Sequence, residues 1–291
     1  MPTDPRMVNK KKVINSVSSM GLCSGITAVL SIVQLSIVAR FLTPEDYGMV
    51  AIPNAILSAT GAMLAGLPLA VIQRESISSS ELYSMQLLLY VSSVLLALLS
   101  IGVGFCFDRI VLSEPIVLVT AVLSLNLLIT AISLLHQVWA RRELNMSLVA
   151  NANIIGAVIG FGVVVYFAYA GHGYWALVYA VLARTAVSTI YIRYRRSLPN
   201  GGEGEWHSAK PLLGFGFSRG MDQFLGQFTS KLDQFLIGSF MGQSNLGLYT
   251  VASNIGRRPV DLLGPILGSV LFPIYSRTVS YTHLRAHETD S

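Results

Sequence analysis

Long apolar runs separated by short polar stretches extend along the chain from residue 15 to residue 275. A helix that crosses a membrane needs about 20 consecutive, mainly apolar residues. On this measure the pattern predicts an all-α, polytopic membrane protein with about eight transmembrane helices. The predicted helices are 15–39, 44–73, 82–106, 115–139, 146–170, 173–193, 211–241 and 245–275.

Two of the polar stretches between these runs carry signals for the start of a helix. Thr43 is followed by Pro44 and, three residues after Thr43, by Asp46, which is the order expected of a capping residue and a first helical turn. Ser78 and Glu81 have the spacing of a capping box. We therefore expect helices to begin directly after Thr43 and Ser78.

Composition supports the membrane class and excludes several others. The chain is 53% hydrophobic and only 12% charged, about half the charge of a soluble domain. Both cysteines, Cys23 and Cys106, lie in apolar runs, so neither a disulfide framework nor a metal site is expected. No phosphate loop, metalloprotease motif or nucleophile elbow occurs. We expect no catalytic site and no cofactor, and the scattered basic residues do not indicate nucleic acid.

Basic residues are distributed unevenly between alternate polar segments. With the N-terminus inside, twelve of them fall on the inner side and only Arg40 and Arg109 on the outer side. Cytoplasmic segments are enriched in Lys and Arg, so the N-terminus is expected in the cytoplasm. The inner residues are Arg6, Lys10, Lys11, Lys12, Arg74, Arg141, Arg142, Arg193, Arg195, Arg196, Lys210 and Arg277.

Five further basic residues lie inside or near predicted helices, and four of them belong to the last two. At 100° per residue, the charged side chains of 211–241 fall on one half of the helix together with its glutamines, while Phe and Leu side chains fall on the other. A shorter charged stretch follows in 245–275. The basic residues are Arg184, Arg219, Lys231, Arg257 and Arg258, and the candidate site residues are Arg219, Asp222, Lys231, Asp233, Arg257, Arg258 and Asp261.

Three interpretations of these charges remain open. Lys231 or Asp233 could form a structural ion pair with a charge in 245–275, or 211–241 could lie in the membrane surface as an amphipathic helix. Alternatively, both helices border a water-filled cavity, since ionised residues inside a membrane usually mark a pathway or a ligand site. The excess of cations over anions then favours an anionic ligand.

Several segments carry a resemblance to a known family. They are ARFLTPEDYGMVAI at 39–52, LPLAVIQRESIS at 67–78, RRELNM at 141–146, GYWALVYA at 173–180 and KLDQFLIGSFMGQSNLGLYTVASNIGRRPV at 231–260. Together they make the chain similar, from about residue 12 to 277, to the bacterial polysaccharide flippases. These are the O-antigen, capsule and exopolysaccharide transporters of the multidrug/oligosaccharidyl-lipid/polysaccharide superfamily.

The resemblance implies a function and a location. Members move undecaprenyl-diphosphate-linked oligosaccharides from the inner to the outer leaflet of the bacterial cytoplasmic membrane, through a cavity between two helix bundles. The expected partners are the lipid-linked oligosaccharide, membrane lipid and the polysaccharide polymerase machinery. The motif LDQFLIG places the family's acidic position at Asp233. The other candidates rest on periodicity alone.

The resemblance also implies a domain organisation and a departure from the family. The expected parts are a cytoplasmic N-terminus at 1–14, a six-helix bundle at 15–193, a cytoplasmic linker at 194–210 and two helices of a second bundle at 211–277. Members have about 12 to 14 spans, so the chain resembles a truncated one, with 278–291 as a non-native tail.

Two rival functions stay open at this stage. One is a multidrug or cation exporter of the same superfamily, for which a more acidic cavity is expected. The other is a non-transporting membrane scaffold, in which the polar half of 211–241 would be buried in a dry helix contact.

Overall fold

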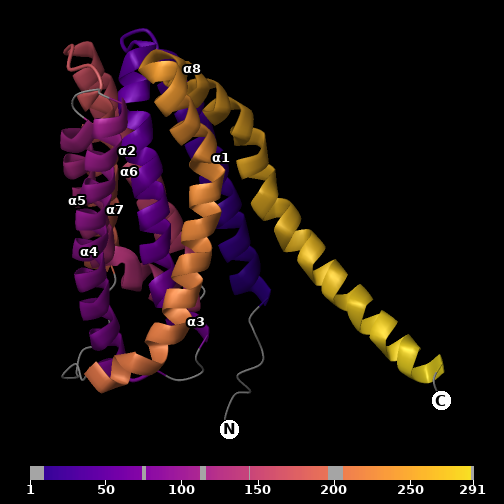
Figure 1. The fold of residues 1–291 in the computed structure, drawn as a ribbon. Helices are drawn as coiled ribbons and strands as arrows, with labels where there is room; N and C mark the ends of the chain where they lie inside the picture. Colours follow the sequence, from indigo (N-terminus) through magenta and orange to yellow (C-terminus); the bar gives the residue numbers. More distant parts are fainter. Residues whose placement is uncertain (1–9, 74–76, 112–115, 144, 196–205, 290–291) are drawn as a thin grey trace. The chain divides into compact units, whose positions relative to one another are not determined.

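The computed structural model describes residues 10–73, 77–111, 116–143, 145–195 and 206–289, with side chains at 21–72, 77–109, 116–143, 145–195 and 213–257. Throughout these residues the regular structure is helical (Figure 1). The α-helices are α1 (Lys10–Val38), α2 (Pro44–Gly66), α3 (Ala70–Gln73), α4 (Ser79–Val111), α5 (Ile116–Arg142), α6 (Met146–Tyr169), α7 (Trp175–Arg195) and α8 (Trp206–Thr289).

Six segments of the described chain are long and apolar enough to cross a membrane. They coincide with the first six predicted spans to within a few residues, so the predicted all-α fold is confirmed. The second segment contains a break that the hydrophobic pattern did not reveal. A short 3-10 turn at Leu67–Leu69 separates α2 from α3, and its Pro68 lacks the N–H group that a continuous α-helix needs.

Both predicted helix starts are confirmed by their hydrogen bonds. The Asp46 amide donates to Thr43 Oγ1 over 3.3 Å, and the Thr43 amide donates to Asp46 Oδ2 over 2.8 Å. The Glu81 amide donates to Ser78 Oγ over 3.2 Å, and the Ser78 amide donates to Glu81 Oε2 over 2.8 Å. These pairs satisfy amide groups that have no partner within the first helical turn.

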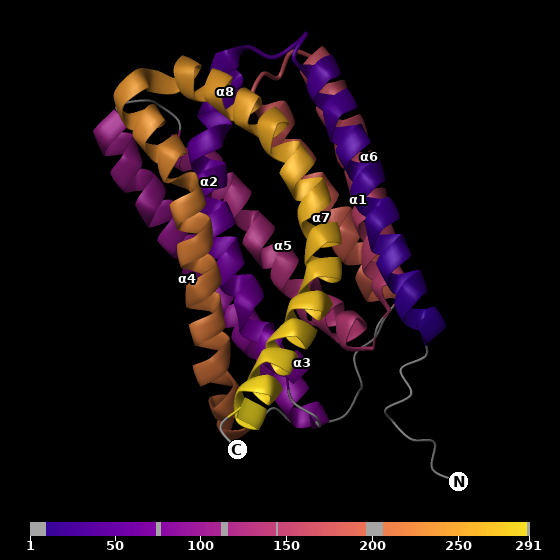
Figure 2. The same ribbon diagram turned by 90° about the vertical axis from the view of Figure 1, so that its right-hand side faces the viewer.

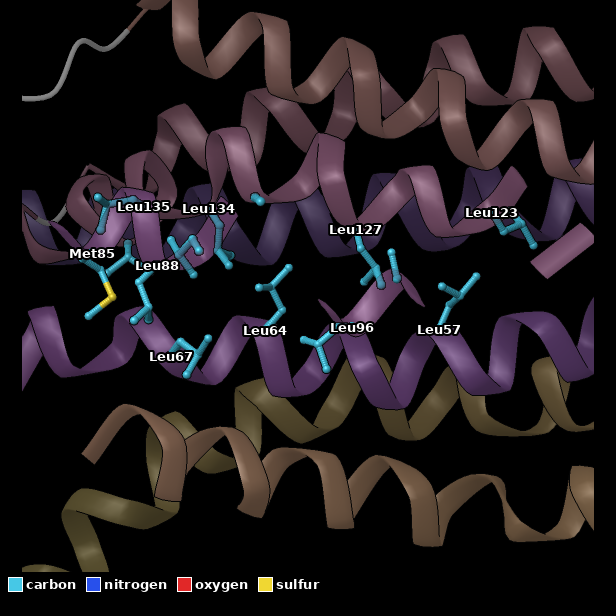
Figure 3. Packing of buried hydrophobic residues seen from close by; sticks show 14 of the residues in the cluster. Leu57, Leu64, Leu67, Met85, Leu88, Leu96, Leu123, Leu127, Leu134 and Leu135 are labelled. Carbon is cyan, nitrogen blue, oxygen red and sulfur yellow. The ribbon is translucent and has the colours of Figure 1, made fainter. Parts of the chain in front are cut away.

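Leucine side chains join α2, α4 and α5 into a core (Figure 3). Leu64 of α2, Leu89 of α4 and Leu123 of α5 are fully buried there. We call this cluster the leucine core; its other leucines are Leu57, Leu67, Leu82, Leu88, Leu96, Leu127, Leu134 and Leu135. It fixes the relative positions of the three helices by interlocking side chains.

The helices α1, α6 and α7 form the other side of the bundle. The helix α7 lies against both α5 and α6, and α1 lies along α6 (Figure 2). The hydroxyl of Ser188 in α7 donates to the Ala152 carbonyl oxygen of α6 over 2.9 Å. The Cys23 thiol of α1 donates to the Ala150 carbonyl oxygen over 3.4 Å. Polar groups therefore supplement the side-chain packing on this side of the bundle.

The long helix α8 is broken at Gly242, which has a left-handed backbone with φ 81° and ψ 173°. This position lies between the predicted spans 211–241 and 245–275, and glycine adopts such a conformation without the steric penalty of other residues. The compact unit that contains α1–α7 extends to Val251, and a second unit comprises Ala252–Ser291. Residues 196–205 lie outside the described part, so the predicted boundary at 194–210 stays a prediction.

Candidate functional site

The first half of α8, residues 206–241, carries four of the candidate residues. Arg219 Nη1 lies 2.7 Å from Asp222 Oδ2, and the two side chains are 49% and 66% exposed. This is a local pair one helical turn apart. At 1.5 Å per residue, Lys231 lies about 18 Å further along the helix axis. The four candidates in residues 206–241 therefore form two separate charged positions, one around Arg219 and one around Lys231.

The second position contains Lys231 and Asp233, both half-buried. Asp233 Oδ1 accepts a hydrogen bond from the Gln234 amide over 2.9 Å. The Tyr249 hydroxyl, beyond the break at Gly242, donates to Asp233 Oδ2. Asp233 thus has a hydrogen-bond partner on the next predicted span. That partner is a phenol and not a charged side chain, so this contact is a hydrogen bond and not the ion pair of the structural interpretation.

Glycines bring residues 216–247 of α8 against α2 along its whole length. A Cβ added to Gly220 would lie 2.7 Å from the Met63 carbonyl oxygen, and one added to Gly216 would lie 2.7 Å from that of Leu67. At the opposite end of α2, a Cβ on Gly247 would overlap the Pro44 carbonyl oxygen. We call this contact the glycine seam; its residues are Gly48, Gly66, Gly216, Gly220, Gly238 and Gly247.

The seam bears on the prediction that the polar half of 211–241 borders a water-filled cavity. Gln234 of the polar half is only 5% exposed. On the apolar half, Leu225 and Leu236 are 53% and 57% exposed. At 100° per residue the seam glycines Gly216, Gly220 and Gly238 fall on the polar half, so part of that half packs on α2. Leucines on the other half are free to face lipid.

Three candidates lie beyond Val251. Arg257 is exposed and belongs to the second unit. The side chains of Arg258 and Asp261 lie outside the described residues. Within the part of the chain that the structure describes, no group of three or more His, Cys, Asp or Glu residues could hold a metal ion.

Polar contacts between α5 and α7 were not among the predicted features. Ser133 Oγ lies 3.0 Å from Thr189 Oγ1, and Arg193 Nη1 lies 3.4 Å from His136 Nε2. His136 is 2% exposed. Because a guanidinium can only donate, Nε2 acts as the acceptor, which requires a neutral imidazole. Single polar residues on apolar helices do not reveal from sequence which residue they will contact, because the facing helix is not known.

Comparison with a protein-family profile gives a match over residues 37–284. The family is described as polysaccharide biosynthesis protein. The match covers well over half of the chain and includes α2–α7 together with most of α8.

Curated relatives come from several bacteria. The chain is 23% identical over 287 residues to the teichuronic acid biosynthesis protein TuaB of Bacillus subtilis (strain 168), covering 95% of the chain and 57% of that protein. It is 24% identical over 284 residues to the lipopolysaccharide biosynthesis protein WzxC of Escherichia coli (strain K12), covering 92% and 55%. It is also 22% identical to an uncharacterized membrane protein in the cps region of Klebsiella pneumoniae, covering 92% and 56%. The chain thus spans a little over half the length of these relatives.

Two solved structures share the fold. An inward-facing multidrug resistance MATE family transporter of the MOP superfamily matches with a TM-score of 0.61 and 17% identity, over 83% of this chain and 60% of that one. A MATE structure in the bent conformation matches with a TM-score of 0.55 and 15% identity, over 88% and 63%. At this level of identity the likeness concerns the fold alone.

Proposed function

Because the chain belongs to the polysaccharide biosynthesis protein family and is a multi-pass membrane protein, we propose that it serves as a flippase for lipid-linked oligosaccharide. The proposed substrate is an oligosaccharide joined to a polyprenyl diphosphate. It would cross the cytoplasmic membrane from the inner to the outer leaflet. The family match supports the polysaccharide part of this proposal, and the transporter fold supports the translocation part.

The observation that carries the proposal is the charged position around Lys231 on α8. Lys231 and Asp233 lie in a helix of 36 residues, 206–241, at least eight residues from the break at Gly242. In the proposal this helix crosses the membrane, where ionised groups far from the helix ends are unfavourable and usually serve a pathway or a ligand. Tyr249 donates a hydrogen bond to Asp233 and so links this position to the next predicted span.

In the proposed mechanism, basic side chains bind the diphosphate while the polyprenyl chain stays in lipid. Lys231 and Arg219 are the candidates within the compact unit, and Arg257 and Arg258 are those beyond it. Asp222, Asp233 and Asp261 would orient these bases or take up a coupling ion. Rocking of two bundles around such a site would expose it to each side in turn. No bond is made or broken, so the proposed process is transport and not catalysis.

The proposed orientation places the N-terminus in the cytoplasm. Arg141 and Arg142 end α5, and Arg193 and Arg195 end α7. These basic helix ends suit the cytoplasmic surface, where the lipid-linked substrate is assembled and loaded. The polysaccharide polymerase machinery would take up the product at the outer surface.

A proteoliposome assay tests the proposed function. Vesicles are loaded with a polyprenyl-diphosphate-linked oligosaccharide in the inner leaflet, and a lectin outside reports the glycan that has crossed. We expect glycan to appear outside faster than in protein-free vesicles, and Lys231→Gln to lower the rate at least about 10-fold, since a charge-assisted contact is lost. Arg195→Gln, at the end of α7, serves as the matched charge control. A wild-type rate equal to that of empty vesicles contradicts the proposal.

Two further measurements address the rival functions. Efflux of an organic cation from the same vesicles, with no movement of the glycan, would favour the drug exporter. Cysteine at position 230 tests the scaffold, because Ser230 lies on the polar half of α8 and is half-buried. An aqueous thiol reagent should label it in a flippase and should fail to do so in a dry helix contact.

A further inference from the structure

Arg184 is a charged residue in the middle of a membrane-spanning helix. It lies nine residues after the start of α7 at Trp175 and eleven before its end at Arg195. Across the six spans found in the described residues, every other Asp, Glu, Lys or Arg lies within the first or last turn of its helix. The unfavourable position of this one charge requires a physical explanation.

Two glycines of α6 make room for the stem of Arg184. A Cβ added to Gly160 would lie 3.0 Å from Arg184 Cβ. One added to Gly156 would lie 3.4 Å from Arg184 Cγ and 2.7 Å from its carbonyl oxygen. Gly162 on the same helix has open space around it. The close approach of α6 is therefore specific to the turns that face Arg184.

The Arg184 side chain as a whole is exposed on the compact unit. A side chain whose stem is held by α6 and which is exposed at mid-span is suited to bind a ligand, since an ionised group facing acyl chains would be strongly unfavourable.

We propose that Arg184 is a phosphate-binding residue of the first helix bundle. This assignment rests on the proposed function, because the ligand is the diphosphate of the lipid-linked oligosaccharide. A guanidinium offers two parallel N–H donors that match two phosphate oxygens. The predicted site residues all lie at or beyond Arg219, so Arg184 adds a contact from a different helix, α7. The substrate would then be held by both α7 and α8.

Binding of farnesyl diphosphate to the purified full chain tests this assignment, with farnesol as the uncharged control ligand. We expect the wild type to bind the diphosphate more tightly than the alcohol. Arg184→Gln should weaken diphosphate binding about 10-fold or more, since a charge-assisted pair is lost, and should leave farnesol binding unchanged. Arg184→Lys should bind the diphosphate with an affinity between those of the wild type and Arg184→Gln. Arg195→Gln is the control, because Arg195 is exposed at the helix end and lies over the Tyr191 ring.

The outcomes separate the two proposals. If the wild type does not distinguish diphosphate from alcohol, the proposed function loses its recognition step. If it does, and Arg184→Gln binds the diphosphate as the wild type does, the assignment of Arg184 is overturned and the proposed function stands. An equal loss for both ligands would show that Arg184 serves the fold, which also overturns the assignment.

A second variant covers the case in which Arg184→Gln fails to fold. Arg184→Cys, with Cys23 and Cys106 replaced by alanine, can be modified with a cationic or a neutral thiosulfonate of similar size. We expect only the cationic adduct to restore diphosphate binding. Equal binding by the two adducts, or protection of the thiol from the aqueous reagents, would contradict the assignment.

Discussion

The helix α2 is held on two sides by different kinds of contact. Toward α4 and α5 it presents large side chains, such as Leu57 and Leu64, to the leucine core. Toward α8 it presents backbone at seam glycines such as Gly66 and Gly220, where the two helices meet without intervening side chains. A smaller side-chain cluster, which includes Ile52 of α2 and Phe235 of α8, lies between these glycines and the far end of the seam. The leucine core joins apolar helices, whereas the glycine seam holds the helix that carries the charges.

The difference follows from how helices associate in a membrane. Lipid tails are as apolar as leucine, so helix association depends on close packing and hydrogen bonds instead of on removal from water. Large side chains achieve close packing by interlocking, and glycines achieve it by letting backbones approach. A glycine contact is narrow, and it leaves Arg219 and Asp222 on the flanks of α8 exposed. The seam thus holds this helix while leaving the Arg219–Asp222 pair exposed.

Gly247→Ala is expected to have the largest effect on stability. The new methyl group would overlap the Pro44 carbonyl oxygen, and backbone atoms cannot move aside as a flexible side chain can. We expect a loss of about 3 kcal/mol in the free energy of unfolding, measured by denaturation in mixed micelles. Gly226→Ala on α8 is the control, because it has open space and should be neutral or slightly stabilising. Equal effects of the two changes would show that the seam is not a close backbone contact.

Leu64→Ala tests the leucine core in the same assay. Leu64 is fully buried, and its truncation leaves a cavity among the leucines of α4 and α5. We expect a loss of about 2 kcal/mol, at the lower end of the range for buried leucines, because the lipid environment removes part of the transfer term. Leu95→Ala on α4, where the side chain is 61% exposed, should cost much less. A larger effect at position 95 would mean that the assigned core is wrong.

The smallest expected effect concerns the hydrogen bond between Asp233 and Tyr249, which joins the two sides of the break at Gly242. In a double-mutant cycle of Asp233→Asn and Tyr249→Phe, we expect a coupling energy of about 1 kcal/mol, typical of a polar contact between membrane helices. The exposed pair Arg219–Asp222 should give about 0.5 kcal/mol or less in an equivalent cycle. If the coupling energy between Asp233 and Tyr249 is no larger than that of the Arg219–Asp222 pair, this hydrogen bond does not stabilise the break at Gly242.

Much of the architecture was accessible from sequence because its signals are local. The six apolar spans and the caps at Thr43 and Ser78 depend on residues within one helix or one turn. The break at Leu67–Leu69 was missed, because Pro68 lies within an apolar run and interrupts the backbone without interrupting the hydrophobicity. The charged positions on α8 were visible as well, since charge in an apolar run is conspicuous in any sequence.

The sequence by itself determined which segments are apolar helices, where they begin and which of them carry charge. Only the tertiary structure decided which face of α8 packs on α2, that Asp233 meets Tyr249, and that Arg184 lies against the glycines of α6. Helical periodicity places side chains around an axis but carries no information about which neighbour approaches. In a membrane both polar and apolar faces can be contact faces, since close packing governs the choice more strongly than hydrophobicity does.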